Sequence, residues 1–323
     1  MDWKGRHVLV TGGAGFIGSH VADALIARGA TVTVYDNFST GVREFVPAKA
    51  RLVEGDLLDQ KKLDEAMRGV DFVFHLAANA DIKDNFREPR KCIDQNVVAT
   101  QNVLEAMRST GTRDIAFSST GSVYGTAKTP TPEDAPFPVQ TSIYASSKIA
   151  AEGLLSSYAQ TDRPAPGFHV WIFRFVSVLG PRYTHGHVYD FWRKLVRDPS
   201  RLDVLGDGKQ AKSYLHVSDC VAAMFVAIEK ATHPNVNIFN LGFDDVLEVD
   251  ESIKIISRTM KVAPRIEYAG GERGWPGDEK RILLDTRAIC ALGWSPTKTI
   301  EESVVETLAF LIANPWFAKR GGA

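Results

Sequence analysis

Hydrophobic residues in the first half of the chain follow two alternating patterns. Short runs rich in β-branched and aromatic residues are typical of buried strands, and apolar residues spaced three and four apart are typical of amphipathic helices. In residues 16–29, Ile17, Val21, Ala24 and Leu25 share one helical face, and Gly29 is a natural C-terminal stop. The pattern predicts strands at 7–10, 31–36, 51–56, 70–78, 114–119 and 168–175, and further helices at 59–68, 94–109 and 144–160.

This alternation predicts an α/β fold in which a doubly wound parallel sheet is covered by helices on both faces. After about residue 180 the alternation becomes irregular, and segments rich in Gly and Pro separate short elements. We interpret this part as a smaller α/β lobe that completes a cleft over the sheet. The expected division is 1–180 for the sheet domain, to which some later segments return, and 181–323 mainly for the lobe.

Composition and charge exclude several classes of partner. The chain of 323 residues carries 38 basic and 39 acidic side chains, so no basic excess points to nucleic acid or to an anionic membrane. Cys92, Cys220 and Cys290 are far apart and show neither metal spacing nor a disulfide framework, which fits a reducing compartment. There is no signal-peptide pattern and no run of 18 apolar residues, so we expect a cytoplasmic protein without a membrane helix.

A glycine-rich turn lies between the first predicted strand and the first predicted helix. Residues 12–18, GGAGFIG, satisfy both G-x-x-G-x-x-G and G-x-G-x-x-G. Glycine is needed where a pyrophosphate approaches bare N–H groups at a helix N-terminus. Asp36 ends the second strand, where a carboxylate accepts from the ribose hydroxyls and repels a 2′-phosphate, and no basic residue follows in DNFSTG. The motif therefore predicts a dinucleotide site that prefers NAD to NADP; the alternative is a glycine-rich turn in another kind of α/β protein.

Two further strand ends are open to two interpretations. Asp56, in GDLLD, is placed either to reach the adenine or to cap the next helix. The small residues of HLAA (75–78) either leave room for a cofactor or simply end a buried strand.

Tyr144 and Lys148, in YASSK, lie four residues apart at the start of a predicted helix, so their side chains share one face. An ammonium beside a phenol stabilises the phenolate and lowers its pKa from about 10. Tyr144 can then remove a proton from a substrate hydroxyl. The alternative, a solvated helix face, is disfavoured because the pair follows both a dinucleotide motif and the Ser/Thr cluster at 118–122.

The chain resembles the extended short-chain dehydrogenase/reductases, and within them the nucleotide-sugar epimerase/dehydratase group. The matching segments are TGGAGFIGSH, YDNFSTG, GDLLD, HLAA, QNVVATQNVLEA, SSTGSVYG, YASSK, RFVSVLGPR, GDGKQAKSYLHVSDC and LGWSP. The resemblance implies a Rossmann-type sheet, tightly held NAD, a nucleoside-diphosphate sugar as substrate, and a catalytic triad of Thr120, Tyr144 and Lys148. It also implies a homodimer in which helices 94–109 and 144–160 pair into a four-helix bundle.

The resemblance further implies which residues contact the two ligands. For NAD they are Gly12, Gly15, Phe16, Ile17, Asp36, Asn37, Asp56, Leu57, Leu76, Ala77, Ala78, Asn96, Tyr144, Lys148 and Phe175. For the nucleotide sugar they are Thr120, Ser122, Ser177, Arg182, Val188, Lys212, Tyr214, Arg273 and Asp278. Two positions depart from the family: Lys212 replaces the usual Arg and loses its bidentate fork, and Ser177 replaces a common Asn.

No metal site is expected. His185 and His187 lie two residues apart in a segment that we expect to form a lid over the substrate, and no third ligand candidate is evident. We therefore interpret both as solvated loop histidines.

The residues before VYG distinguish between the reactions of the family. Members that eliminate water carry an acid pair at the positions of Gly121 and Ser122, and the nucleotide-glucuronate decarboxylases carry Glu at the position of Ser122. Neither acid is present. Elimination needs a second acid/base pair, so the simplest outcome after oxidation at C4 is reduction of the 4-keto sugar from its other face. Thr120 would hydrogen-bond O4.

The leading hypothesis is therefore NAD-dependent 4-epimerisation of a UDP-hexose, which interconverts UDP-glucose and UDP-galactose. An alternative substrate is UDP-glucuronate or a UDP-N-acetylhexosamine, since Ile282 rather than a large aromatic residue aligns beside the sugar. A different class of function is a non-catalytic NAD-binding regulator on the same fold. The intact Thr120, Tyr144 and Lys148 argue against it, because a regulator has no need of a base.

Overall fold

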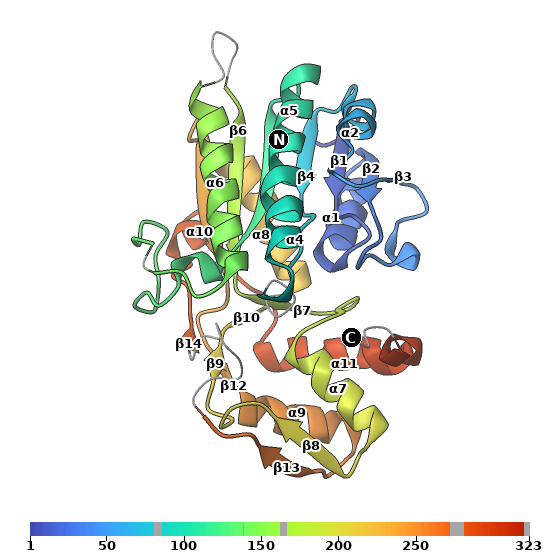
Figure 1. Cartoon of the computed structure of the whole chain (residues 1–323), viewed down its shortest axis with the longest axis vertical. Coiled ribbons are helices and arrows are strands. Elements are labelled where there is room, and N and C mark those ends of the chain that lie inside the picture. Colours follow the sequence, from blue (N-terminus) through green and yellow to red (C-terminus); the bar gives the residue numbers. More distant parts are fainter. Residues whose placement is uncertain (81–85, 138, 162–166, 272–280, 320–323) are drawn as a thin grey trace.

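The computed structural model describes residues 1–80, 86–137, 139–161, 167–271 and 281–319. Its centre is a seven-stranded parallel sheet in the order β11-β6-β5-β4-β1-β2-β3 (Figure 1). The strands are β1 (His7–Thr11), β2 (Thr31–Asp36), β3 (Arg51–Glu54), β4 (Phe72–His75), β5 (Asp114–Thr120), β6 (His169–Phe175) and β11 (Val236–Leu241). This is the Rossmann-type doubly wound sheet that the alternating pattern predicts.

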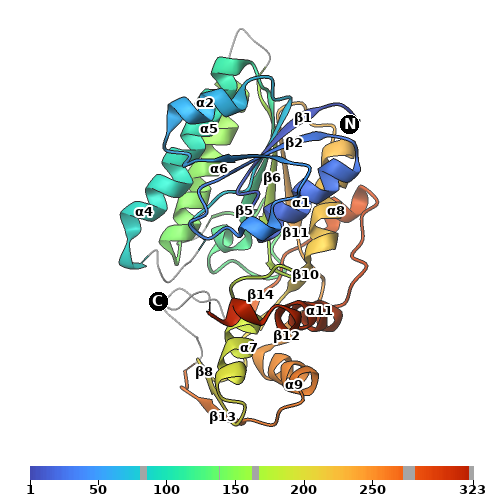
Figure 2. The same ribbon diagram turned by 90° about the vertical axis from the view of Figure 1, so that its right-hand side faces the viewer.

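Helices cover both faces of the sheet (Figure 2). On one face lie α2 (Gln60–Met67), α5 (Ala99–Thr110) and α6 (Ile143–Thr161), and on the other lie α1 (Phe16–Ala27) and α8 (Val217–Lys230). Because both faces are covered, the central strands carry apolar residues toward both sides, and Val8, Leu9 and Val10 of β1 are completely buried.

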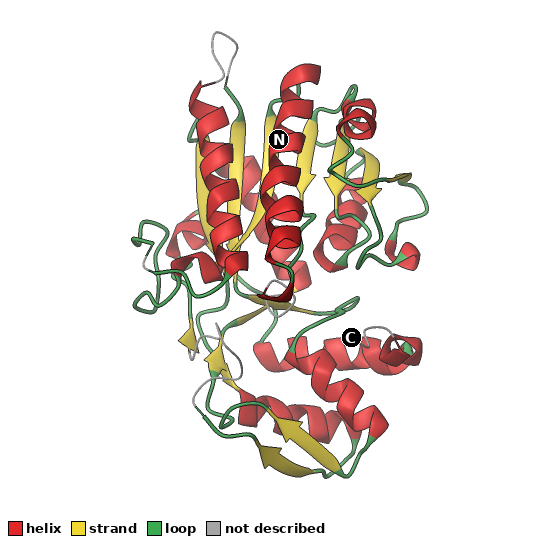
Figure 3. Cartoon of the chain, viewed as in Figure 1, coloured by secondary structure: helices red, strands yellow, loops and turns green. Residues whose placement is uncertain are grey.

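The smaller lobe lies beyond the carboxyl ends of the strands and contains short sheets and helices (Figure 3). Its helices are α7 (His187–Arg197), α9 (Val249–Met260) and α11 (Ile300–Ala313). Its strands pair as β8 (Arg201–Val204) with β13 (Arg265–Tyr268), and as β9 (Ala211–Lys212) with β12 (Leu247–Glu248) and β14 (Arg281–Ile282). Beside the main sheet lie the pair β7 (Ser177–Leu179) and β10 (Tyr214–His216), and the short α10 (Arg287–Ala291). Among the described residues, no helix combines the length and apolarity needed to cross a bilayer.

The structure refines several sequence-based bounds. The strand expected at 70–78 is only Phe72–His75, and the residues that follow form a loop at the site. The helix expected at 94–109 begins earlier, as α4 (Pro89–Ile93), and passes through a π-helical turn (Asp94–Val98) into α5. The pattern does not single out β11 and α8, which come after residue 180. β11 is a strand of the main sheet, and α8 packs on one of its faces.

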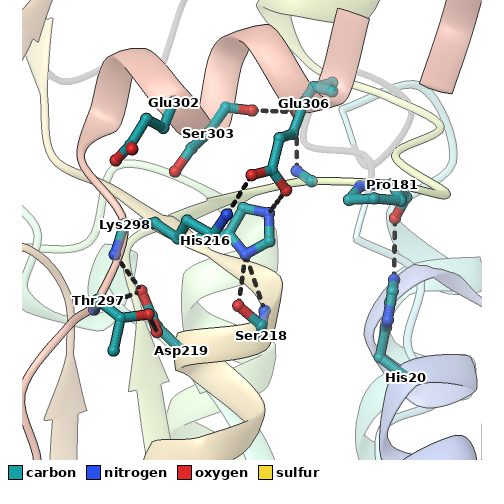
Figure 4. A network of polar contacts seen from close by, with 12 residues as sticks. His20, Pro181, His216, Ser218, Asp219, Thr297, Lys298, Glu302, Ser303 and Glu306 are labelled. Atoms are coloured by element: carbon teal, nitrogen blue, oxygen red, sulfur yellow. Dashed lines mark hydrogen bonds and ion pairs between the residues drawn. The ribbon is translucent and has the colours of Figure 1, made fainter. Parts of the chain in front are cut away.

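A polar network joins the sheet domain to the lobe (Figure 4). His216, at the end of β10, has Nδ1 2.6 Å from the Ser218 hydroxyl and Nε2 3.2 Å from Glu306 of α11. Glu306 also pairs with Lys298. On the other side of the junction, the Pro181 carbonyl lies 2.9 Å from His20 Nε2 of α1. These contacts hold the chain segments that pass from the sheet into the lobe.

Candidate active site

The strand order reverses between β1 and β4, and the loops that follow these two strands diverge there. Such a switch point, at the carboxyl ends of the strands, is where doubly wound sheets bind ligands. The glycine turn of residues 12–18 lies at this point, between β1 and α1.

The backbone of this turn is packed too closely to accept side chains. A Cβ on Gly12, whose φ is +68°, would lie 2.7 Å from the Ala77 nitrogen, and a Cβ on Gly18 would lie 2.2 Å from the Gly12 carbonyl oxygen. Gly15 is the N-cap of α1, so the first N–H groups of the helix, at Phe16 and Ile17, open toward the turn. A bare backbone cradle at a helix N-terminus fits the pyrophosphate of NAD.

Asp36 lies at the end of β2 with its carboxylate facing the glycine turn. One oxygen accepts from the Ala14 N–H at 3.0 Å and the other from the Phe38 N–H at 2.8 Å. Burial raises the pKa of Asp36, and the two N–H donors partly offset that rise. A carboxylate held between the first and second strands is placed for the ribose of a dinucleotide, as the sequence predicts.

Asp56 does not cap a helix. The N-cap of α2 is Asp59, which accepts from the Lys62 N–H. Asp56 instead accepts from the Asn37 side chain at 2.9 Å and from the Leu58 N–H at 2.9 Å. Burial raises its pKa, but these hydrogen bonds outweigh burial and the net shift is downward. Of the two interpretations of Asp56 from sequence, the structure therefore removes the capping role, and the adjacent Leu57 is buried beside it.

After β4 the chain forms a loop, Leu76–Ala78, against the glycine turn, and Asn96 holds the next residue of that loop. The Asn96 side chain accepts from the Asn79 N–H at 2.7 Å and donates to its carbonyl at 3.1 Å. It also donates to the Ser147 hydroxyl at 2.9 Å, which connects the loop to α6. Asn96 lies in the π-helical turn, a feature often found at functional sites. The protein contacts already use its amide, so they give it a positioning role.

The predicted catalytic triad comes together where β5 ends and α6 begins. The Thr120 and Tyr144 hydroxyls are hydrogen-bonded to each other. Lys148 is buried, and its Nζ donates to the Ser118 carbonyl at 2.8 Å. Phe175, at the end of β6, is the register partner of Thr120 and closes this side of the site.

Burial dominates the charge state of the triad. It raises the pKa of Tyr144 above its usual range, Cys92 adds to that rise, and the hydrogen bond from Thr120 opposes it. Burial lowers the pKa of Lys148 to about 7. The lowered Tyr144 pKa expected from sequence is therefore not produced by the protein groups alone, because desolvation of the partly buried Tyr144 outweighs its hydrogen bond from Thr120. A further positive charge beside Tyr144, such as oxidised nicotinamide, would act in the required direction.

Position 121, where an acid would indicate an eliminating enzyme, is tightly packed against a neighbouring side chain. A Cβ on Gly121 would lie 3.2 Å from Leu284 Cδ1 and 3.3 Å from the Phe175 carbonyl oxygen. Leu284 is buried, and the residues on either side of it are hydrogen-bonded to the backbone of Thr131. Ser122 donates its N–H to the Thr120 hydroxyl at 3.1 Å.

Several predicted substrate residues gather between the sheet and the lobe. Ser177 of β7 is exposed and is the register partner of Tyr214 of β10. The Tyr214 hydroxyl lies 3.2 Å from His187 Nδ1. Lys212 of β9 is near enough to help lower the pKa of His187, while Val188 is completely buried. This group lies beyond β6, on the lobe side of the triad.

Arg182 has a protein partner. Its guanidinium is 2.7 Å from Asp23 of α1, so it bridges the lobe and the sheet domain. Arg273 and Asp278 lie outside the described residues.

The interpretation of His187 as a solvated loop residue is wrong. His187 begins α7, its Nε2 lies 2.7 Å from the Ser252 hydroxyl, and burial lowers its pKa to about 3. His185 is exposed and stacks on Tyr183. Within the described ranges, no three His, Cys, Asp or Glu side chains are grouped as metal ligands.

Sequence reasoning missed a buried ion pair beside the triad. Glu152 of α6 and Arg174 of β6 form two hydrogen bonds, at 3.1 and 2.7 Å. Glu152 continues the four-residue spacing of Tyr144 and Lys148, a signal that could have identified it. The contact of Leu284 with Gly121 had no such local signal.

Comparisons with known proteins identify the family of the chain. Residues 8–242 match the family model described as "NAD dependent epimerase/dehydratase family". The chain is 32% identical to a UDP-glucose 4-epimerase of Corynebacterium glutamicum, over 93% of each chain. It is 31% identical to a UDP-N-acetyl-alpha-D-glucosaminuronate decarboxylase of Bacillus cytotoxicus, over 94% of this chain and 97% of the relative. A solved UDP-galactose 4-epimerase superposes with a TM-score of 0.87 and 38% identity, covering 96% of this chain and 100% of that one. This chain therefore belongs to the NAD-dependent epimerase/dehydratase family, and NAD is its cofactor.

Proposed function

We propose that the protein is a UDP-hexose 4-epimerase that interconverts UDP-glucose and UDP-galactose. The observation that carries the proposal is the triad at the end of β5 together with the absence of an acid at positions 121 and 122, the first of which is tightly packed against Leu284. The sequence relatives act on UDP-sugars by epimerisation or by decarboxylation, so the choice between these reactions depends on the residues of this chain.

When bound, NAD would supply a reversible two-electron acceptor for C4 of the sugar. Tyr144 removes the proton of the C4 hydroxyl and later returns it, and the Thr120 hydroxyl, bonded to Tyr144, aligns the same oxygen. Lys148, held by the Ser118 carbonyl, lies one helical turn along α6 from Tyr144. Because the proton and the electrons both return to the sugar, substrate and product have the same mass.

The surroundings of Thr120 disfavour the other reactions of the family. A side chain at position 121 would press on Leu284, which would have to shift by a few tenths of an ångström, and neither Gly121 nor Ser122 is an acid. Loss of water needs one group to remove the C5 proton and another to protonate the leaving hydroxyl. Gly121 and Ser122 provide neither, so rotation of the 4-keto sugar and its reduction from the other face remain the simplest course.

The test is to incubate the purified protein with UDP-glucose and, separately, with UDP-galactose, without added NAD. We expect both reactions to reach one mixture of the two sugars, by NMR, with no change in mass. UDP-glucuronate is the comparison substrate. A main product lighter by water or by carbon dioxide would refute the proposal.

We also propose a homodimer through α5 and α6, as the resemblance implies. Ile93 and Val98, on the segment that leads into α5, are each 38% exposed, and Ala150 and Ser157 of α6 are exposed and small. Close approach of a second helix pair would cover these residues. Light scattering should give twice the monomer mass, and Ala150→Glu should halve it; a wild-type monomer would refute the dimer.

A further inference from the structure

The last three residues of β5 hold three side chains of α6. Those side chains are four residues apart, so they form one stripe along the helix that faces the strand end. The pairs are the Ser118 carbonyl with Lys148 Nζ at 2.8 Å, the Ser119 hydroxyl with Glu152, and the Thr120 hydroxyl with Tyr144. Two of these three side chains belong to the proposed triad, and the third, Glu152, has no role in it.

Glu152 is buried and charged, and its partner is buried as well. The residue is 6% exposed and Arg174 is 2% exposed. Arg174 donates to Glu152 through Nε at 3.1 Å and through Nη2 at 2.7 Å, which is a bidentate pair. Such a geometry fixes both position and direction of the carboxylate.

Arg174 is itself held from three sides. On adjacent strands, Ser119, Arg174 and Asn240 are register partners, so they form one polar row across β5, β6 and β11. Arg174 Nη1 donates to the Tyr124 hydroxyl at 2.7 Å, and that hydroxyl donates to Asn240 Oδ1 at 2.8 Å. The carboxylate is therefore anchored to the sheet rather than to the helix alone.

We propose that Glu152, anchored by Arg174, is a positioning residue that keeps the Lys148 side chain charged and aligned below Tyr144. Two buried cations lie near Glu152, Arg174 in the row and Lys148 on α6, and its carboxylate acts on both. Removing it would leave Lys148 without a compensating carboxylate in a poorly solvated site, whereas Arg174 would keep its electrostatic interaction with Glu133. Its part in catalysis rests on the proposed function, but the charge of Lys148 does not.

Other groups that face Lys148 do not replace this charge. On α6 they are Tyr144 and Glu152; from neighbouring elements they are Cys92 of α4, His75 of β4, and Arg174 and Tyr124 around the carboxylate. Burial raises the pKa of the Cys92 thiol and lowers that of His75 to about 3, so both are neutral near pH 7. Burial lowers the pKa of Lys148, and Glu152 acts in the opposite direction.

The test is Glu152→Gln in the full chain, purified with its NAD. Labelling the lysines with ¹³C at Cε allows Lys148 to be titrated by NMR. Its signal is identified by its absence from the spectrum of Lys148→Met. Without the carboxylate, the Lys148 midpoint should fall by about one pH unit or more, the size typical of a nearby opposite charge. The midpoint of the alkaline limb in the pH profile of kcat should fall together with the Lys148 midpoint.

Two further variants make the test decisive. Glu152→Asp keeps the charge but moves it, and should give a smaller fall. Asp219→Asn removes another buried carboxylate, one that accepts from Thr297 at 2.9 and 2.7 Å far from the triad, and should lower the melting temperature without moving the Lys148 midpoint.

An unchanged Lys148 midpoint in folded Glu152→Gln, or a fall in Glu152→Asp as large as in Glu152→Gln, would overturn the proposal and leave Glu152 a structural residue only. If the wild type converts no UDP-hexose, the proposed function fails while the NMR titration still tests Glu152.

Discussion

Gly18→Ala should damage the cofactor site while leaving the rest of the chain intact. The added Cβ would lie 2.2 Å from the Gly12 carbonyl oxygen, 2.8 Å from the Gly12 carbonyl carbon and 2.9 Å from Gly13 Cα, where 3.4 Å or more is ordinary contact. These are backbone atoms of the glycine turn, so the turn must move by about 1 Å. Overpacking of this kind costs about 1–3 kcal/mol. If that cost falls on the bound state, NAD binds about 5- to 150-fold more weakly.

The assay measures NAD released from the purified variant by heat, its Kd for added NAD by calorimetry, and its unfolding in urea. The matched control is Gly153→Ala, also a helical glycine, whose Cβ would meet nothing within 4 Å. The control should keep its NAD and gain about 0.5–1 kcal/mol of stability, because alanine favours the helix. If Gly18→Ala changed neither the NAD affinity nor the stability, the glycine turn would not be as closely packed as described.

Three further predictions concern the base, the choice of cofactor and pH. Tyr144→Phe should keep NAD yet lose activity by about 10²-fold or more, since it removes the proposed general base; near-normal turnover would exclude Tyr144 from the mechanism. Asp36→Ala with Asn37→Arg should weaken NAD and strengthen NADP in direct titrations, and tighter NADP binding by the wild type would contradict the role of Asp36. His75 is fully buried between Thr11 and Thr100, and burial lowers its pKa from 6.5 to about 3. The unfolded state takes up this proton first, so the free energy of unfolding should fall by about 1.4 kcal/mol per pH unit on acidification from about pH 6 to 4, and His75→Asn should reduce that slope in urea titrations.

Short-range patterns allowed most of the fold and the triad to be predicted. Tyr144 and Lys148 are four residues apart, and Asp36 directly ends a strand after a glycine turn, so local sequence fixes their relation. Leu284 and Gly121, by contrast, meet only because the segment after β14 returns to the end of β5. Such a contact depends on the path of the whole chain, and no window of sequence contains it.

The histidines illustrate the same limit. The sequence around His187 predicts a loop, but His187 is the first residue of α7 and is hydrogen-bonded to Ser252 of α9. The pattern near residue 187 does not reveal that a later helix, α9, packs beside His187. The sequence likewise shows Lys148 and Tyr144 on one face, but not that burial raises the pKa of the tyrosine.

The position of β11 at the edge of the sheet affects how the chain folds during synthesis. β6 is complete at Phe175, but its outer partner, β11, ends only at Leu241, after much of the lobe has been made. At roughly 5–20 residues per second, the outer edge of β6 stays unpaired for several seconds on the ribosome. That edge carries Trp171, Ile172 and Phe173, which makes the nascent first half a candidate for chaperone binding and a poor choice for expression alone.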